Sequence, residues 1–315
     1  MFSLKKNNLI FRKNTPFWRR YFYLILLLVF LIFIGAIFGS SFNAKFNRLV
    51  KKIKNEKPVP VIIYKAEETI KILEGWMNAD IDHYLQERNF SDWEEAGFLK
   101  AVGERRIYDV EKPQNFSRAW AEEFDFLVSK PENLSLEGYL FPDTYRVFAS
   151  SSPEEIVYRL LSNFDAKLSQ EMREEIKRQG KTIHEIITMA SIIEKEAPIL
   201  NQTSAQDAKI ISGIFWNRLD IGMALQTDAT LSYIFEDKKS AHSGAELKVE
   251  SPYNSYLYRG LPPGPIANPG LIAIEAAIYP TETDYFYFLT PLDGSRVYYA
   301  KTYQEHLNNK YKYLK

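Results

Sequence analysis

An uncharged, apolar run near the N-terminus constrains this chain more than any other feature. No charged residue occurs from Tyr21 to Phe38, and the uncharged run continues to Ala44. About 20 apolar residues in a helix are enough to cross the hydrocarbon core of a bilayer. We therefore expect one transmembrane helix at residues 21–39. The small residues at 39–41 also fit a cleavable signal peptide, but the length of the run and of the segment before it favours an uncleaved anchor.

The orientation of this helix does not follow from charge alone, because basic residues both precede and follow the run. Long domains cross the membrane largely regardless of charge. We therefore expect a short basic leader at residues 1–20 inside the cytoplasm, a juxtamembrane spacer at residues 40–58, and the large C-terminal part outside.

The charge balance differs between the two parts of the chain. The whole sequence has 40 basic and 40 acidic residues, and residues 1–57 contain 12 bases and one acid. The remaining 258 residues therefore carry 28 bases and 39 acids, a net charge of −11. An acidic domain argues against a nucleic-acid partner, because phosphates require a basic surface. A neutral or amphoteric substrate fits better.

Cysteine and histidine usage excludes several kinds of chemistry. The sequence has no cysteine, so disulfides, thiolate metal sites and a cysteine nucleophile are excluded. Four scattered histidines show no metal-ligand spacing. No nucleotide-binding fingerprint is present either. We therefore expect neither a metal nor an organic cofactor.

The part that follows the spacer reads as an α+β protein. A β-branched run at 59–64 predicts a strand, and the helix-like residues Glu67 to Met77 follow it. We expect a small membrane-proximal α+β module at residues 59–130, and a mainly helical domain at residues 131–315. Two strands around Asp293 and Gly294 predict a C-terminal β-hairpin.

The rest of the C-terminal part reads mostly as helices. The predicted helices lie at 115–130, 153–168, 169–180, 203–219, 271–278 and 303–314. The segment 222–230 reads instead as a loop, because it is rich in short polar residues.

One further helix is marked more clearly than the others. Thr182 is followed three residues later by Glu185, directly before an apolar periodic run, which is a capping-box signature. Pro198 predicts the end of this helix. The sequence therefore predicts a helix at residues 182–197.

The acidic residues of this helix differ in their predicted surroundings. At 100° per residue, Glu194 lies in the middle of the apolar stripe, whereas Glu185 and Glu196 lie roughly opposite, where water is expected. Unless a cation pairs with it, a carboxyl on an apolar face has a raised pKa, which suits a general acid at neutral pH. The alternatives are that Glu194 reaches solvent near the helix end or pairs with Arg218.

Three other segments combine turn residues with polar side chains, and the first and the third of them also contain aromatic residues. They are LEGYLFPDTY at 136–145, MALQTDAT at 223–230 and SPYNSY at 251–256. The next segment, GLPPGPIANPG at 260–270, has four prolines and three glycines and predicts a stiff loop of defined shape. Such loops either pack against the core or line a site.

These segments, together with ASIIEKEA at 190–197 and IFWNRL at 214–219, resemble the endolytic murein transglycosylases, which carry a YceG-like domain. The resemblance extends from Val59 to the C-terminus, and several motifs in the same order are more specific than any one of them. In that family the membrane-proximal part is LysM-like. Here it is shorter, and only one strand-helix unit is visible between residues 59 and 102.

The resemblance implies a bacterial single-pass protein of the cytoplasmic membrane whose catalytic domain lies outside the cytoplasm. Such an enzyme cleaves the bond between N-acetylmuramic acid and N-acetylglucosamine without water and leaves 1,6-anhydro ends, and it has a role in glycan strand termination. The catalytic glutamate of the family maps to Glu194, with Glu196 as the fallback. The expected substrate-binding residues are Glu137, Gln226, Asp228, Thr230, Tyr253, Asn254 and Tyr256.

Two other hypotheses about the function fit the same residues. The first is a muramidase-type hydrolase, in which Glu194 is the acid and Asp228 activates water or attacks the sugar. The second is a non-catalytic, membrane-anchored scaffold that binds glycan or proteins of the division machinery. The expected partners are peptidoglycan glycan strands, the membrane, and peptidoglycan synthase or divisome proteins.

Overall fold

The computed structural model describes two compact units, residues 1–64 and 65–315. The described residues are 17–38, 45–47, 50–51, 67–88, 90, 97–103, 116–197, 202–237, 239, 241–291 and 296–314. Side chains are described within these ranges except at 17–20, 35–38, 116–119 and 202–204.

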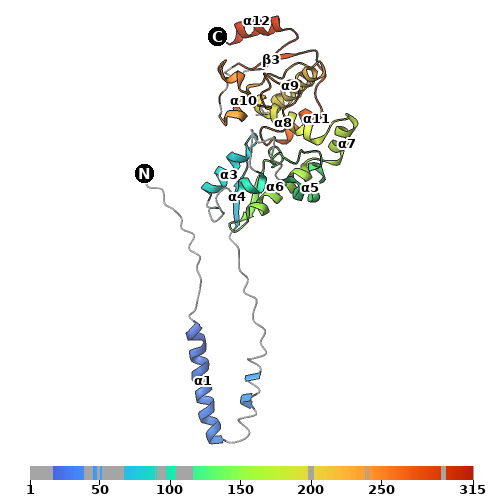
Figure 1. Ribbon diagram of the computed structural model, residues 1–315. Helices are drawn as coiled ribbons and strands as arrows, with labels where there is room; N and C mark the ends of the chain where they lie inside the picture. Colours follow the sequence, from blue (N-terminus) through green and yellow to red (C-terminus); the bar gives the residue numbers. More distant parts are fainter. Residues whose placement is uncertain are drawn as a thin grey trace, which may run out of the picture. The chain divides into compact units, whose positions relative to one another are not determined.

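In the first unit, helix α1 spans Phe17–Phe38, so the predicted apolar helix is confirmed as a helix (Figure 1). Over the residues that the structure describes, no helix is long and apolar enough to cross a membrane. The membrane crossing therefore stays a prediction. The predicted strand at 59–64 lies outside the described residues, as does most of the spacer.

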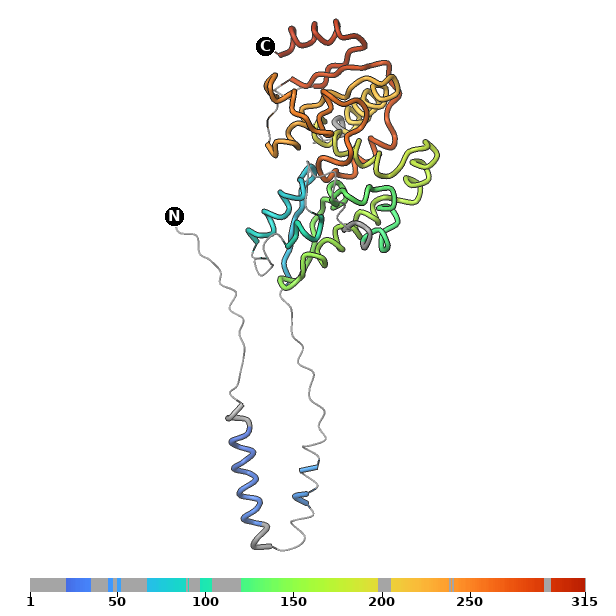
Figure 2. Tube along the Cα trace, in the orientation of Figure 1, coloured from blue at the N-terminus to red at the C-terminus, as the bar shows by residue number. Residues whose placement is uncertain are grey.

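The second unit is mainly helical, as predicted (Figures 1 and 2). Its helices are α3 (Asn78–Glu87), α4 (Gly97–Val102), α5 (Phe116–Glu123), α6 (Pro153–Lys167), α7 (Gln170–Arg178), α8 (Ile183–Glu196), α9 (Gln202–Asp220), α10 (Asp228–Phe235), α11 (Leu271–Ile278) and α12 (Tyr303–Tyr313). Two 3-10 turns, η1 (Asp125–Leu127) and η2 (Glu246–Lys248), and four strands complete it. Figure 1 shows α3 to α6 gathered at one end and α8 to α12 at the other.

Two antiparallel strand pairs lie in this unit. Strand β1 (Glu67–Lys71) pairs with β2 (Thr144–Phe148), with Glu67 opposite Phe148. The prediction of helix-like residues at 67–77 was wrong in this part, because a partner strand more than 70 residues away fixes the segment as extended. Strand β3 (Tyr287–Leu289) pairs with β4 (Tyr298–Ala300), which confirms the predicted C-terminal hairpin.

The pairing of β1 with β2 crosses residue 130, where we predicted a boundary between two modules. In the order of the chain, α3, α4, α5 and η1 lie between the two antiparallel strands β1 and β2. The boundary and the LysM-like character of this part stay predictions.

Helix α8 is the centre of the second unit. Thr182 is its N-cap, with a side chain that accepts from the backbone N–H of Glu185, while the Glu185 carboxylate accepts from the backbone N–H of Thr182. The predicted capping box is therefore confirmed. Ile186, Ile192 and Ile193 are fully buried, and α8 packs against α9, α10 and α11. Because it is surrounded, α8 holds the side chains at its C-terminal end in fixed positions.

We expect Thr182→Ala to lower the free energy of unfolding by about 1 kcal/mol, because the backbone donor at Glu185 loses its acceptor. Urea unfolding followed by circular dichroism measures this change. Thr182→Ser keeps the hydroxyl and serves as the control, with stability close to that of the unchanged chain. Equal losses in both variants would contradict the capping role.

Candidate active site

Glu194 lies in the last turn of α8 and is half-buried. Its Oε2 atom accepts a hydrogen bond of 2.9 Å from the backbone N–H of Gly270. Gly270 ends the stiff Pro-Gly loop and is the N-cap of α11. The predicted loop therefore contributes directly to the surroundings of the predicted acid.

Glu74, which the sequence did not single out, lies next to this pair. It is exposed and follows β1. A side-chain carbon built on Gly270 would lie only 2.0 Å from Glu74 Oε1, so the Glu74 carboxyl occupies the space beside the Gly270 α-carbon. A carbon built on Gly75 would lie 3.9 Å from Glu194 Oε1. Two carboxyl groups thus meet at Gly270.

Burial raises the pKa of Glu194 to about 7. The Gly270 hydrogen bond opposes this rise, the negative charge of Glu74 adds to it, and Lys195 acts weakly against it. Glu194 does not pair with Arg218, whose charge acts on Glu196 instead. A carboxyl with this pKa is partly protonated at neutral pH and can both donate and accept a proton.

Glu196, the fallback residue, was expected to face water, and this expectation was wrong. Its carboxylate accepts hydrogen bonds from the Thr227 hydroxyl and from the backbone N–H of Ala229, at the start of α10. Burial raises its pKa, the Thr227 hydrogen bond lowers it, and the charge of Asp228 raises it further. Periodicity placed Glu196 on the outer face of α8, but the loop before α10 covers that face.

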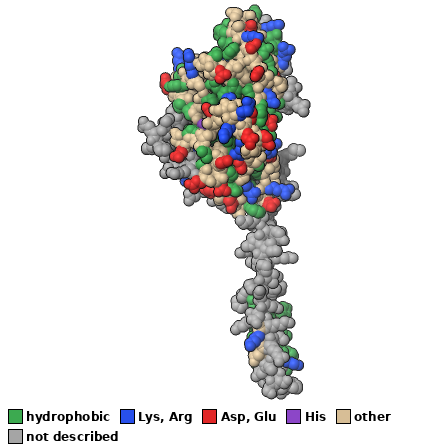
Figure 3. Space-filling view, turned by 90° about the vertical axis from the view of Figure 1, so that its right-hand side faces the viewer, with side chains coloured by type: hydrophobic (Ala, Val, Ile, Leu, Met, Phe, Trp, Pro, Cys, Tyr) green, Lys and Arg blue, Asp and Glu red, His purple; other side chains and the backbone are tan. Residues whose placement is uncertain are grey.

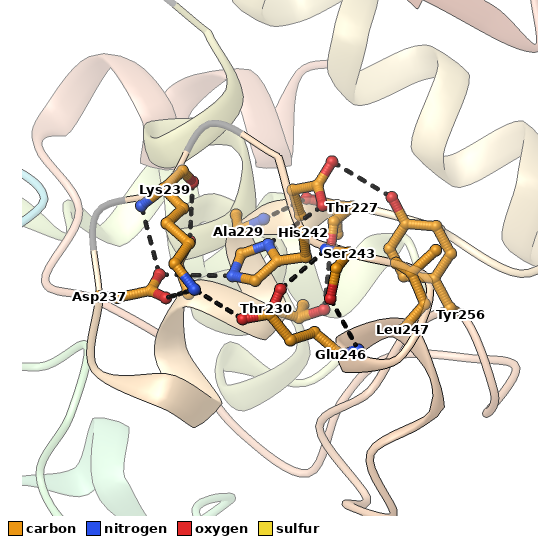
Figure 4. Close-up of polar contacts among 12 residues, drawn as sticks. Thr227, Ala229, Thr230, Asp237, Lys239, His242, Ser243, Glu246, Leu247 and Tyr256 are labelled. Atoms are coloured by element: carbon orange, nitrogen blue, oxygen red, sulfur yellow. Dashed lines mark hydrogen bonds and ion pairs between the residues drawn. The ribbon is translucent and has the colours of Figure 1, made fainter.

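Figure 4 shows a polar cluster that includes Thr227, His242 and Tyr256. Asp228, the first residue of α10, belongs to this cluster. Its Oδ1 atom is 3.2 Å from Nδ1 of His242, and its Oδ2 atom accepts from the Tyr256 hydroxyl at 3.3 Å. The other ring nitrogen of His242 is 3.3 Å from Asp237 Oδ1, and the His242 side chain has no exposed area. Burial raises the pKa of Tyr256, and the Asp228 charge adds to this. Asp228 and Tyr256 therefore lie together, and their contact with a substrate stays a prediction.

The remaining predicted residues of this region have mixed surroundings. Gln226 is exposed and has a φ of 50°. Thr230 is fully buried and bonds the carbonyl of Thr227 and the hydroxyl of Ser255. Of these, only Gln226 offers its side chain to a ligand. Thr227, Asp228 and Thr230 belong to α10 or its cap, so the prediction of a loop through residue 230 was wrong at its end.

Tyr253 and Asn254 are also buried. Tyr253 packs on the ring of Tyr233, with ring centres 4.9 Å apart. The Asn254 amide donates to the carbonyls of Leu247 and Val249. Both side chains therefore support the loop that presents Tyr256, and direct contact with a substrate stays a prediction.

Glu137 is buried, and both its carboxylate oxygens accept from the backbone N–H of Asn78 at 3.2 Å. Asn268 lies beside it and donates to Glu137 Oε1 and to the carbonyl of Trp76. Its Oδ1 atom accepts from the N–H groups of Gly138 and Leu140. Through these contacts Glu137 holds the segments around Glu194 in place. A role of Glu137 in substrate binding stays a prediction.

Two hollows in the surface lie apart from these residues. One of about 850 Å³ lies between β2 and α6 and includes Asp143, Tyr145 and Asn163 in its lining. The other, of about 580 Å³, lies beside η1 and α7. Neither hollow is lined by Glu194 or Glu196, so the candidate acids lie outside both of them. Among those residues, no group of histidine and acidic side chains has the arrangement of a metal site.

The fold and these acids define an α+β protein in which Glu194, at the end of a buried helix, and Glu74 place their carboxyl groups beside Gly270. The profile of the YceG-like family matches residues 40–312, and the chain belongs to that family.

Two relatives with assigned names match the sequence. The chain is 40% identical over 180 residues to the endolytic murein transglycosylase of Bacillus subtilis, covering 57% of this chain and 48% of the relative. It is 37% identical over 179 residues to the protein of the same name from Streptococcus pneumoniae, covering 55% of this chain and 31% of the relative. The alignments therefore span about half or less of the length of these relatives.

A solved structure supports the fold over a larger part. A crystal structure of a YceG-like protein from Listeria monocytogenes superposes with a TM-score of 0.64 at 32% sequence identity. The match covers 83% of this chain and 80% of that one.

Proposed function

We propose that this protein is an endolytic murein transglycosylase that cleaves glycan strands of peptidoglycan without water. The observation that supports this most directly is Glu194, a half-buried carboxyl with a pKa of about 7, in a chain of the YceG-like family. Both relatives described above bear this enzyme name.

In the proposed reaction, protonated Glu194 donates its proton to the glycosidic oxygen while the bond from that oxygen to C1 of N-acetylmuramic acid breaks. The C6 hydroxyl of the same sugar then forms a bond to C1, and its proton passes to the Glu194 carboxylate. The products are a 1,6-anhydro end and a free hydroxyl on the other fragment, and Glu194 regains its proton. One group serves as acid and then as base.

The substrate is proposed to pass Glu194 and the N-terminal end of α10. Gln226, Asp228 and Tyr256 are the predicted contacts with the most accessible side chains. The buried residues Thr230, Tyr253 and Asn254 support the segments that carry them, and Glu137 supports the segments around Glu194. On the face in Figure 3, acidic and basic side chains are interspersed over the second unit, which suits a substrate with both charges.

We further propose that α1 anchors the protein in the bacterial cytoplasmic membrane, with the leader inside and residues 65–315 outside. The apolar sequence of α1 and an extracytoplasmic substrate support this arrangement. The same proposal includes a role in ending glycan strands during wall synthesis and contacts with synthase or divisome proteins. It also includes the partly LysM-like character of residues 59–130.

The test uses the full chain in mild detergent, incubated with purified peptidoglycan, with the products identified by mass spectrometry. Anhydro-muramic ends support the lytic reaction. Reducing ends would instead favour the muramidase-type hydrolase, in which case Asp228→Asn should abolish turnover. No product from a chain with a normal unfolding transition would favour the scaffold.

We expect the rate to fall as pH rises through about 7, because the first step needs the protonated form of Glu194 and its pKa is about 7. The measurement is kcat/KM between pH 5 and 9. Asp220→Asn, an exposed change at the end of α9, should leave the profile unchanged. A rate that stays level up to pH 9 would contradict Glu194 as the acid.

A further inference from the structure

Gly270 is the point at which two carboxyl groups meet. Its N–H donates to Glu194, and the carboxyl of Glu74 fills the space that a side chain at position 270 would occupy. The two acids come from distant parts of the sequence, the segment after β1 and the end of α8. A hydrogen bond of 2.9 Å from the N–H of Gly75 to the carbonyl of Asn268 fixes the first segment against the Pro-Gly loop.

The proposal rests on the proposed function. We propose that Glu74 is the second functional carboxylate of this site, placed beside Glu194 so that its negative charge favours the protonated acid and faces the sugar as positive charge develops there. Gly270 is required between them because any side chain at this position would displace the Glu74 carboxyl.

The surroundings of Glu74 leave its charge available. Among the described residues, no cation or hydrogen-bond donor contacts the Glu74 carboxylate, and the side chain is exposed. Lys195 is directed to the carbonyl of Gly75, to which its Nζ donates at 3.2 Å. An unpaired negative charge close to a carboxyl disfavours ionisation of that carboxyl.

The groups that face Glu194 act in opposite directions. The Gly270 N–H and the N-terminus of α11 favour the anion, as does Lys195. Glu74 and the apolar surroundings favour the acid. This balance suits a group that must first lose a proton and then regain one. Glu74 would also stabilise an oxocarbenium-like sugar by direct attraction of opposite charges.

The experiment compares the full chain with Glu74→Gln in detergent, with purified peptidoglycan as the substrate. We expect Glu74→Gln to lower the apparent pKa of the alkaline limb of kcat/KM by about one unit. We also expect kcat at pH 7 to fall about tenfold, with little change in KM. Glu74→Asp keeps the charge and should recover most of the pH profile. Glu67→Gln, an exposed change in β1, is the matched control and should change neither value.

A second variant tests the geometry. Gly270→Ala should displace the Glu74 carboxyl and shift the pH profile in the same direction as Glu74→Gln. Adding Gly270→Ala to Glu74→Gln should then shift the profile no further. A pH profile in Glu74→Gln that equals that of the unchanged chain would overturn the proposal.

A titration separates this proposal from the reaction itself. In a chain labelled with ¹³C at its glutamate carboxyls, Glu194 is identified by the signal that Glu194→Gln lacks. We expect its titration to move to lower pH in Glu74→Gln, whether or not the chain yields anhydro ends. Absence of product would then count against the transglycosylase, and an unmoved titration would count against Glu74.

Discussion

Glu194→Gln should lower the turnover of peptidoglycan by about 100- to 10,000-fold, the usual contribution of a positioned general acid. Glutamine keeps the size of the side chain and can still accept from the N–H of Gly270, but it has no acidic proton to donate. The measurement is the initial rate of formation of anhydro-muramic ends by the full chain. A variant that keeps more than a tenth of the rate would exclude Glu194 as the acid.

The same variant should not destabilise the protein, and this separates a catalytic carboxyl from a structural one. The folded-state pKa of Glu194 is about 7, above its value in the unfolded chain. Folding therefore favours the protonated form, and stability is lost as pH rises from the unfolded value through 7. At pH 8 a neutral glutamine should leave the unfolding midpoint unchanged or higher. A glutamate held in an ion pair, as the scaffold reading requires, would give a lower midpoint.

Glu196→Gln distinguishes the fallback residue. The carboxylate of Glu196 accepts from the Thr227 hydroxyl and the Ala229 N–H, so it holds the cap of α10 to the end of α8. We assign it to this structural role. Full loss of turnover in Glu196→Gln, together with an active Glu194→Gln, would reverse the two assignments.

Features that depend on neighbouring residues could be predicted from the sequence. The cap of α8 depends on Thr182 and Glu185 alone, and both ends of the α11 helix were predicted at the residues that the structure shows. The apolar stripe of α8 pointed to Glu194 for the same reason, since the helix itself fixes which side chains share a face.

Features that depend on distant segments could not be predicted. β1 was read as helix-like because its strand character comes from β2, and Glu196 was placed in water because the chain that covers it begins 31 residues later. Glu74 showed no signal in the sequence beyond its position before a glycine. Its nearness to Glu194 exists only because Gly75 is bonded to the loop that contains Asn268.

That loop explains why the site forms where it does. The carboxyl pair needs the segment after β1, the end of α8 and the start of α11 in one place, and Asn268 joins two of these to the segment at 137–140. The Pro-Gly loop is also hydrogen-bonded to α8. The carbonyl of Pro263 contacts Nε2 of His184, and the N–H of Ile266 donates to the hydroxyl of Ser191. The stiff loop and its hydrogen bonds therefore fix the position of the Gly270 N–H.

Asn268→Leu should therefore lower the free energy of unfolding by about 3 kcal/mol, because the buried N–H groups of Gly138 and Leu140 lose their acceptor at once. Asn268 has no exposed area, its Oδ1 accepts from Gly138 and Leu140, and its amide donates to Trp76. For a unit of this size, such a loss lowers the melting temperature by about 6 °C or more. Urea unfolding of the full chain measures it.

Asn308→Leu is the matched control, because this asparagine accepts one hydrogen bond on the exposed face of α12, and its loss should change stability by no more than about 0.5 kcal/mol.

Asn268→Asp should have a stability between those of the unchanged chain and Asn268→Leu. It keeps the acceptor for Gly138 and Leu140 but directs a carboxylate oxygen toward the carboxyl of Glu137. Two facing carboxyls favour protonation, so this variant should regain stability as pH falls from 8 to 5. If Asn268→Leu melts like Asn308→Leu, the bonds around Asn268 do not hold the segments together, and the position of Gly270 beside Glu194 requires another cause.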